Sequence, residues 1–310
     1  MAMISYAQNQ EDVRLRRAFR GHDRGFYVDA GAAHPVFDSV TKTFSLAGWR
    51  GVNIEPLPDL FALLCADRPH DVNLNVGLSS AAGTLAFYRV PACDGWSTFS
   101  PEVAAGLARG GAVIEEVRMP VRTLADVCAE HARGLIDFLK VDVEGHERAA
   151  LTGGDWGRYR PRVVVVEATE SNSPVPNHHL WEDVLLGAGY LFVAFDGVNR
   201  YYVRPEDRHL AEALALPVSV LDDFVPYRYQ HQIDALRGEV DRRIGELLQF
   251  HADVAAKELH LALQQKQIGA LERRLEPLLA LEPVGPRLRG LALRLHRLAL
   301  RLRWRGASRP

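Results

Sequence analysis

The segment from Gly25 to Pro56 constrains the fold of this chain most strongly, because it joins two apolar strands through a single glycine turn. The first predicted strand, residues 26–30, runs into Gly31, which can adopt backbone angles that other residues avoid and lets a ligand approach the main chain. The second predicted strand, residues 52–54, ends in Glu55. In nucleoside-binding α/β folds, an acidic residue at this place accepts hydrogen bonds from a ribose diol. The segment therefore predicts a strand–turn–helix–strand unit with an adenosyl-type cofactor site.

A nicotinamide or flavin dinucleotide is the alternative ligand for such a unit. Its pyrophosphate requires a G-x-G-x-x-G turn, whose glycine amides and helix start hold the phosphates. Here the turn reads Gly-Ala-Ala-His-Pro, and Pro35 lacks an amide donor. The pattern favours a phosphate-free cofactor such as S-adenosylmethionine over a dinucleotide, and a structural turn without a ligand remains the other alternative.

A second informative stretch runs from Ile136 to Leu151, where a buried type of strand is followed by acidic residues and then by a helix. Asp142 is expected at the carboxyl end of this strand, with Glu144 and His146 just beyond it. In open parallel sheets, ligands bind outside the carboxyl ends of the strands. These side chains and Lys140 are therefore expected to share one crevice with Asp29 and Glu55.

A third predicted strand, residues 162–168, reads Arg-Val-Val-Val-Val-Glu-Ala. An unbroken run of valines is typical of a strand that is covered on both faces. Glu167 then reaches the same sheet edge, and Asn172 lies a few residues into the following loop. Lys140, on the preceding strand, is expected to orient the acidic side chains rather than to react.

Strands and helices alternate from Gly25 to about Tyr190, which predicts a parallel sheet covered by helices. Two short apolar runs, residues 191–195 and 200–204, are joined by Asp-Gly-Val-Asn and therefore predict an antiparallel hairpin. Residues 79–121 contain several Gly and Pro residues and indicate an inserted segment of short strands and loops. This segment is a candidate lid or acceptor-binding region over the cofactor side.

Several separate blocks, in order, resemble the FkbM family of S-adenosylmethionine-dependent methyltransferases, and the resemblance covers roughly residues 4–205. The blocks are ISYAQNQEDV (4–13), YVDAGAAHPVFDSVTK (27–42), GWRGVNIEP (48–56), NLNVGLS (73–79), WSTF (96–99), VRTL (121–124), DFLKVDVEGHE (137–147) and VVVEA (164–168). The chain departs from the family pattern at Gln10 and Ala33, where glycine and asparagine are more common. It also carries His146 where a small residue is common.

The resemblance implies a Rossmann-like class I methyltransferase fold, in which a mostly parallel seven-stranded sheet is closed by an antiparallel hairpin. It also implies S-adenosylmethionine as cofactor and O-methylation of a hydroxyl on a sugar, polyketide or cell-envelope glycan. The residues expected to bind the cofactor are Asp29, Gly31, Glu55, Asn75, Gly77 and Asp142. The family pattern further suggests that Tyr6, Gln8 and Asp12 help to close the cofactor or acceptor site.

A hydroxyl acceptor must lose its proton during methyl transfer, and two routes remain open. In one, Asp142, Glu144 or His146 acts as the base. In the other, Asp142, Glu167 and Asn172 hold a divalent ion such as Mg²⁺, whose charge lowers the hydroxyl pKa. For His146, a surface position at a helix N-terminus is the alternative. A non-catalytic nucleoside-binding scaffold that assembles partners through a coiled coil is the alternative function.

The composition predicts a cytoplasmic protein that does not bind nucleic acid. The formal net charge of the 310 residues is −2, which gives the whole chain no electrostatic basis for binding nucleic acid. The three cysteines lack the C-x-x-C spacing of a zinc ribbon. No run reaches the ~18 apolar residues of a membrane span. Asp12, Arg14 and Arg16 interrupt the region where the apolar core of a secretory signal would lie.

Beyond Pro226 the pattern becomes helical, so residues 1–226 are expected to form the methyltransferase-like domain and residues 227–282 a coiled-coil helix. The first (a) position of seven heptads is always apolar: Ile233, Val240, Leu247, Val254, Leu261, Ile268 and Leu275. The fourth (d) positions are mixed, with apolar Leu236, Phe250, Leu271 and Leu278 but polar Arg243, Lys257 and Gln264. This pattern predicts a homo-oligomer through residues 233–278. The alternative is a helix that packs on its own domain or breaks at Gly238, Gly245 and Gly269.

Residues 283–310 are expected to form a basic amphipathic tail. One face carries Leu288, Leu291, Leu295, Leu298 and Leu302. No acidic residue lies between Arg287 and Pro310, and this stretch holds eight arginines and Trp304. Such a helix suits peripheral contact of residues 287–305 with an anionic membrane, at its inner face. Docking on an acidic protein partner or on the chain's own coiled coil is the alternative.

Overall fold

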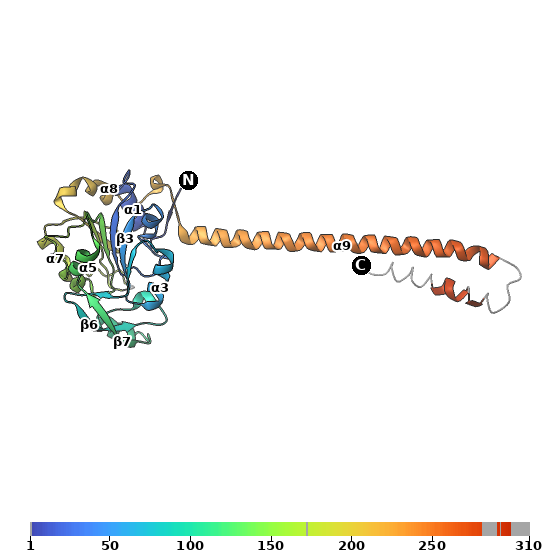
Figure 1. Cartoon of the computed structure of the whole chain (residues 1–310), viewed down its shortest axis with the longest axis horizontal. Helices are drawn as coiled ribbons and strands as arrows, with labels where there is room; N and C mark the ends of the chain where they lie inside the picture. The colour runs from blue at the N-terminus through green and yellow to red at the C-terminus, as the bar shows by residue number, and fades with distance from the viewer. Residues whose placement is uncertain (1, 172, 281–289, 292, 299–310) are drawn as a thin grey trace. The chain divides into compact units, whose positions relative to one another are not determined.

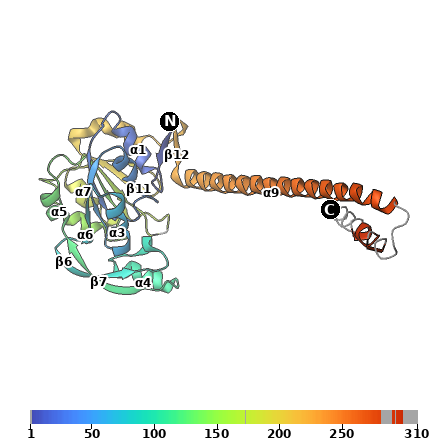
Figure 2. The same cartoon turned by 45° about the vertical axis from the view of Figure 1, so that its right-hand side comes forward.

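The computed structural model describes residues 2–171, 173–280, 290–291 and 293–298 (Figure 1). The chain divides into two compact units, Met1–Gln232, called here the first unit, and Ile233–Pro310, called here the helical unit. The first unit combines strands and helices, whereas the described part of the helical unit is helical (Figures 1 and 2).

A seven-stranded sheet forms the centre of the first unit, with the strand order β10-β11-β9-β8-β2-β3-β4. Its strands are β2 (Phe26–Ala30), β3 (Arg50–Ile54), β4 (Val72–Leu74), β8 (Phe138–Val141), β9 (Val163–Glu167), β10 (Leu191–Phe195) and β11 (Asn199–Val203). All neighbouring pairs from β9 to β4 are parallel, whereas β11 is antiparallel to both β9 and β10. The predicted mostly parallel α/β fold is confirmed, and the 191–195 and 200–204 runs lie at the closing hairpin.

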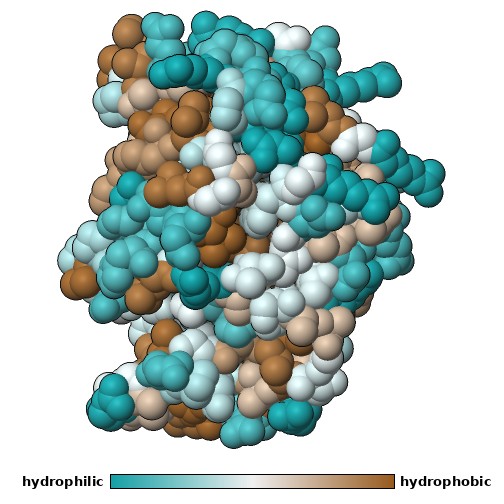
Figure 3. Space-filling view, turned by 90° about the vertical axis from the view of Figure 1, so that its left-hand side faces the viewer, coloured by the Kyte–Doolittle hydropathy of each residue, from teal (hydrophilic) through white to brown (hydrophobic). Residues whose placement is uncertain are grey.

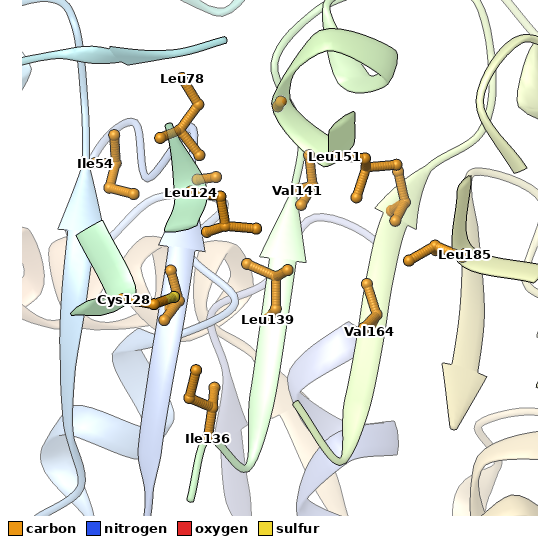
Figure 4. Packing of buried hydrophobic residues seen from close by; sticks show 14 of the residues in the cluster. Ile54, Leu78, Leu124, Cys128, Ile136, Leu139, Val141, Leu151, Val164 and Leu185 are labelled. Atoms are coloured by element: carbon orange, nitrogen blue, oxygen red, sulfur yellow. The ribbon is translucent and has the colours of Figure 1, made fainter. Parts of the chain in front are cut away.

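Helices cover both faces of the sheet. The α-helices are α1 (Glu11–Ala18), α2 (Lys42–Leu46), α3 (Pro58–Asp67), α4 (Pro101–Arg109), α5 (Leu124–His131), α6 (Glu147–Thr152), α7 (Glu182–Gly187), α8 (Ala211–Ala215) and α9 (Tyr227–Ala280). Short 3-10 helices lie at Asp94–Trp96, His178–Leu180, Pro205–Leu210 and Val220–Asp222. Helices α5, α6 and α7 contribute to one buried cluster, part of which is shown in Figure 4, and α1, α2 and α8 contribute to the other.

The valine run of β9 shows why the strand needs two covered faces. Val164 and Val166 belong to the cluster on the α5–α7 side, whereas Val163 and Val165 belong to the cluster on the α1–α2 side. All four valines are fully buried. Because successive side chains of a strand point to opposite faces, only apolar residues at every position can satisfy both layers.

The inserted segment forms a second, three-stranded sheet with the order β5-β7-β6. Its strands are β5 (Gly77–Leu78), β6 (Gly83–Arg89) and β7 (Glu115–Arg122), and α4 lies between β6 and β7 in the chain. Leu57, Phe87 and Phe99 share a small apolar cluster, which ties this sheet to the loop after β3. The insertion is thus packed on the side of the central sheet where Glu55 lies.

The ends of the first unit meet in a two-stranded parallel sheet. In it, β1 (Met3–Ser5) pairs with β12 (Phe224–Pro226).

Figure 3 shows the face that includes α7, where hydrophobic residues are interspersed among hydrophilic ones. The exposed apolar residues include Leu186 of α7 and Phe192 of β10.

Helix α9 is continuous over 54 residues. It passes through Gly238, Gly245 and Gly269 without a break, so the interrupted-helix alternative is wrong for this helix. The side chain of the predicted d residue Leu278 is not described. Residues 290–291 and 293–298 of the tail are helical. Leu288, Leu302 and Trp304, which were expected to contribute to the membrane contact, lie outside the described residues. Within the described residues, none of the helices is long and apolar enough to cross a membrane.

Candidate active site

The carboxyl ends of β2, β3, β8 and β9 surround one cavity of about 510 Å³. Parallel register sets this arrangement, because Asp29 lies opposite both Asn53 and Lys140, and Lys140 lies opposite Val165. The polar and glycine residues that line the cavity are Gln8, Gly31, His34, Asp38, Glu55, Gly77, Asp94, Gly95, Ser97, Lys140, Asp142, Glu144 and Glu167. The sequence-based expectation that Glu55, Asp142, Glu144 and Glu167 converge therefore describes their actual positions.

Gly31 is required at the end of β2 for two reasons. Its φ of 76° lies in the left-handed region. A Cβ at this residue would also lie 1.8 Å from the carbonyl oxygen of Asp142. The glycine therefore permits the turn after β2 to approach the turn after β8, while it also lines the cavity.

Glu55 forms part of the cavity wall and fixes the two turns around it. Its Oε2 accepts a hydrogen bond from the Ala33 amide at 2.8 Å, and its Oε1 accepts one from the Leu57 amide at 2.8 Å. Burial raises the pKa of Glu55 to about 7, and these two hydrogen bonds oppose that effect. Each carboxylate oxygen keeps a second acceptor position. Glu55 is thus pre-oriented to accept hydroxyl hydrogens from a ligand in the cavity.

Asp29 is buried and does not line the cavity. Its Oδ2 accepts a hydrogen bond from Thr41 Oγ1 at 2.6 Å, and its Oδ1 lies 3.6 Å from Lys140 Nζ. Fully buried Arg68 donates hydrogen bonds to Thr41 and to the Asn53 side chain. Asp29 therefore belongs to a buried polar network. It stabilises the turn after β2 through these contacts, and its carboxylate does not face the cavity.

Lys140 connects this support to the cavity. Its ammonium group donates to the Gly31 carbonyl at 2.6 Å and lies 3.3 Å from Asp142 Oδ2. Burial alone would lower the pKa of Lys140, but the carboxylates of Asp142 and Asp29 outweigh burial and raise it above its usual value. Lys140 thus remains a cation and orients its acidic neighbours, as expected.

Three acidic side chains form what we call the acidic cluster: Asp142, Glu144 and Glu167. Each offers a carboxylate oxygen, and these atoms lie within 4.8 Å of one another. Burial, and next the charge of Asp142, raise the pKa of both Glu144 and Glu167. Ser171 Oγ donates to Glu144 Oε2 at 2.6 Å, which favours the charged form of Glu144. Such a cluster holds protons or a cation at neutral pH.

Asn172, the third expected metal ligand, lies outside the described residues. Glu144 belongs to the acidic cluster together with the other two expected ligands, Asp142 and Glu167. Its backbone has a left-handed φ of 53° and is followed by Gly145 with φ 87°. Glu147, which was not anticipated, holds this loop because its Oε1 accepts hydrogen bonds from the Val143 and Gly145 amides. The Glu at the start of a helix was the sequence signal for this role.

His146 does not line the cavity. Its Nε2 lies 3.3 Å from Ser79 Oγ, and its ring lies 5.5 Å from the ring of Phe99. Burial lowers its pKa below the usual value. The side chain thus packs toward the inserted sheet, and the structure does not bring it together with Asp142 and Glu144 at the cavity.

The remaining expected residues have different environments. Gln8 and Gly77 line the cavity, whereas Asn75 donates to the carbonyl oxygens of Glu55 and Pro56 and supports the turn. Tyr6 stacks on Tyr227 at 4.7 Å. Buried Asp12 accepts hydrogen bonds from the Ser5 hydroxyl and the Tyr6 amide, so it fixes the N-terminal segment.

The sequence analysis expected residues 79–121 to form a lid or acceptor-binding region but did not single out the aromatic side chains that line one side of the cavity. This side is lined by Phe37, Phe87, Trp96 and Phe99. Phe87 and Phe99 pack with ring centroids 4.6 Å apart. The aromatic residues of the inserted segment were the available signal, because pockets for small molecules are lined mainly by apolar and aromatic side chains.

Parts of this chain are similar to known methyltransferases. Residues 29–192 match the methyltransferase FkbM domain. A methyltransferase named sdnD from Sordaria araneosa is 34% identical over 181 residues, which cover 49% of this chain and 69% of that protein. A solved TehB-like SAM-dependent methyltransferase from Corynebacterium glutamicum matches with a TM-score of 0.37 and 11% identity, covering 63% of this chain and 87% of that one.

Proposed function

The chain belongs to the FkbM methyltransferase family, and from this premise we propose that it is an S-adenosylmethionine-dependent O-methyltransferase. The proposed acceptor is a hydroxyl of a sugar or of a cell-envelope glycan. One observation carries the proposal: Glu55, suited to a ribose, and the acidic cluster, suited to a hydroxyl proton, line the same cavity.

The residues present fit the cofactor. The cavity of about 510 Å³ falls in the size range of small-molecule sites. Buried Glu55 offers acceptor positions at the carboxyl end of β3, and Gly31 leaves the end of β2 without a side chain. Pro35 and the missing glycines leave no cradle for a pyrophosphate, which argues against a dinucleotide. When bound, S-adenosylmethionine supplies an electrophilic methyl group.

Asp142 and Glu144 are the two proposed bases for the acceptor hydroxyl. Both line the cavity, whereas His146 does not, so the histidine is not retained in this role. A general base works best when its pKa lies near the operating pH, and the pKa of Glu144 is raised to about 8. Lys140, 3.3 Å from Asp142, holds that carboxylate in place through its ion pair. Proton removal by a positioned base contributes typically ~10²–10⁴-fold to a rate.

A divalent cation held by the acidic cluster is the alternative way to activate the hydroxyl. The carboxylate oxygens of the cluster's three members lie within 4.8 Å of one another, and oxygen is the ligand type that Mg²⁺ binds. This set contains Asp142 and Glu167, which the sequence predicted as metal ligands, and also Glu144. Burial is the main cause of the raised pKa of Glu144 and Glu167, and a cation would relieve the second cause, which is repulsion from Asp142.

The aromatic side of the cavity supports an acceptor that has an apolar face. Phe87, Trp96 and Phe99 line it, together with Leu57 and Leu60 of the turn and helix after β3. Aromatic rings present such a surface with little loss of conformational entropy. A pyranose ring combines an apolar face with several hydroxyl groups, and this combination matches the aromatic side and the acidic cluster.

The test is incubation with labelled S-adenosylmethionine and a pool of sugar nucleotides and cell-envelope glycans, followed by mass spectrometry for a methyl gain. We expect Asp142→Asn and Glu144→Gln to lower the rate by roughly 10²-fold or more while the fold stays largely intact. Glu170→Gln, an exposed carboxylate outside the cavity, is the matched control. Activity that survives thorough chelation removes the metal route.

The non-catalytic scaffold is the competing function. It predicts that calorimetry detects S-adenosylmethionine binding while no acceptor in the pool gains a methyl group. Heat on addition of NADH, with none on addition of S-adenosylmethionine, would overturn the cofactor assignment itself.

A further inference from the structure

Helix α9 exposes an apolar seam along most of its length. The side chains of Ile233, Leu236, Val240, Leu247, Phe250, Leu261 and Leu271 are between 41% and 66% exposed. The three glycines of the helix fall at heptad positions f and b, away from this seam. A long exposed helix gains most of its stability from packing of its apolar face, so the seam requires a partner.

We propose that the partner is a second copy of this chain and that the two α9 helices pair in antiparallel orientation. The polar residues at the d positions carry the argument. In a parallel dimer, each d residue faces its own copy. Arg243 would then lie against Arg243 of the second copy, and Lys257 against Lys257 of the second copy. Two layers of the seam would contain like charges.

Antiparallel pairing removes both of these repulsive layers. Each d residue then faces an a residue of the other helix, and every a residue is apolar. In the register of greatest overlap, Val240 faces Leu271 and Phe250 faces Leu261. Arg243 faces Ile268 and Lys257 faces Val254, so each long side chain packs its aliphatic stem on the seam and extends its charge to water.

The flanking e and g residues are complementary in the same register. Antiparallel helices pair g with g and e with e. Glu239 then meets Arg274, Arg237 meets Glu272, and Asp253 meets His260 of the second copy. His251 meets Glu258, and the remaining e and g contacts involve no like charges. In a parallel dimer, by contrast, Asp253 would meet Glu258.

The existing contacts within α9 are compatible with this arrangement. Glu239 accepts hydrogen bonds from Arg242 and Arg243 of its own helix, which holds its carboxylate beside the seam. Each proposed interhelical pair occurs twice, because a two-fold axis relates the chains and residue i contacts j as j contacts i. The two chains enter the coiled coil from opposite ends.

Cysteine cross-linking separates the orientations. In a background in which Cys65 and Cys93 are serine and buried Cys128 is retained, we expect Val240→Cys combined with Leu271→Cys to form an oxidised dimer. Val240→Cys alone is expected to give none, because the two residues 240 would lie about 46 Å apart along antiparallel helices. In a parallel dimer the single variant would cross-link, since its two sulfurs would face each other.

A charge reversal gives an independent test in solution. Arg274→Glu places a like charge against Glu239 of the second copy in both symmetric pairs, and it is expected to weaken the dimer on the order of ten-fold in sedimentation equilibrium. Arg273→Glu, on the outer face of the same turn, is the matched control and is expected to leave the dimer unchanged. In a parallel dimer Arg274 has no acidic partner, so its reversal would have no such effect.

Two results support the proposal and three overturn it. A dimer that is cross-linked only by the double cysteine variant and weakened only by Arg274→Glu supports it. A full-length chain that sediments as a monomer at tens of micromolar overturns it. This holds also if the monomer covers the seam with its own tail. Cross-linking by Val240→Cys alone, or equal dissociation of the Arg273 and Arg274 variants, also overturns it.

Discussion

Replacement of Lys140 by methionine tests whether one buried cation supports the whole cavity edge. The ammonium group lies 3.6 Å from Asp29 Oδ1, 3.3 Å from Asp142 Oδ2 and 2.6 Å from the Gly31 carbonyl oxygen. Asp29 is 1% exposed, and its Oδ1 has no hydrogen-bond partner. Lys140→Met therefore leaves a buried carboxylate without a compensating cation.

The expected cost follows from the burial of the pair. Removing one partner of a buried ion pair costs about 3–5 kcal/mol, because the other charge is left uncompensated. The lower end applies here, since Asp29 Oδ2 keeps its hydrogen bond to Thr41 and Asp142 is partly exposed. A loss of about 3 kcal/mol lowers the melting temperature of a domain of this size by about 6–12 °C.

Tryptophan fluorescence during thermal or denaturant unfolding is the suitable assay, because Trp49, Trp96, Trp156 and Trp181 all lie in the first unit. Lys42→Met is the matched control. Lys42 pairs with Asp67 nearer the surface, so its loss should cost less than about 1 kcal/mol.

A second variant distinguishes the charge effect from simple loss of packing. Asp29→Asn combined with Lys140→Met removes the uncompensated charge and should recover part of the lost stability. Full recovery is not expected, because the Gly31 carbonyl still lacks its donor. If Lys140→Met unfolds within about 1 kcal/mol of wild type, or if the double variant is no more stable than Lys140→Met alone, the reasoning is refuted.

Three further predictions concern the cofactor, pH and the tail. Glu55→Ala should weaken S-adenosylmethionine binding by roughly 1–3 kcal/mol in calorimetry through lost charge-assisted hydrogen bonds, and wild-type affinity in this variant would remove Glu55 from the site. The pKa of the Glu167 carboxyl is raised in the folded state, so the folded protein holds a proton that the unfolded chain has released, and stability should fall as pH rises from 6.5 to 8. With metal chelated, Glu167→Gln should reduce this slope by up to about 1.4 kcal/mol per pH unit, and an unchanged slope would exclude Glu167 as its source. Truncation after Pro226 should leave a soluble enzyme that methylates a small acceptor, whereas truncation after Pro286 should abolish flotation with anionic liposomes. Equal flotation with and without residues 287–310 would rule out the membrane contact.

Local sequence patterns were sufficient for the strands and for the edge at which the site lies. The apolar run 26–30 and the valines of β9 have residue types that suit only strands buried on both faces. Parallel strands end at a common edge, so the acidic residues that follow β3 and β8 had to meet there. The heptad pattern likewise predicted a long helix, but only the structure excluded a break at its three glycines.

Side-chain direction required the tertiary structure. Asp29 lies in β2, directly before the Gly31 turn, yet its side chain joins a hydrogen-bond network with Thr41 and Arg68. His146 is two residues from Glu144, but the left-handed turn at Glu144 and Gly145 directs the two side chains to different neighbours. Neither direction is encoded by a periodic pattern.

The sequence by itself determined which chemical groups reach the cavity edge, because strand burial and parallel order are properties of residue type and chain order. The tertiary structure alone decided which of these groups face the cavity and which form buried contacts that stabilise its turns. That division depends on contacts between residues far apart in the chain, such as Lys140 with Gly31 and Arg68 with Thr41. Such contacts follow from packing geometry, which no local stretch of sequence specifies.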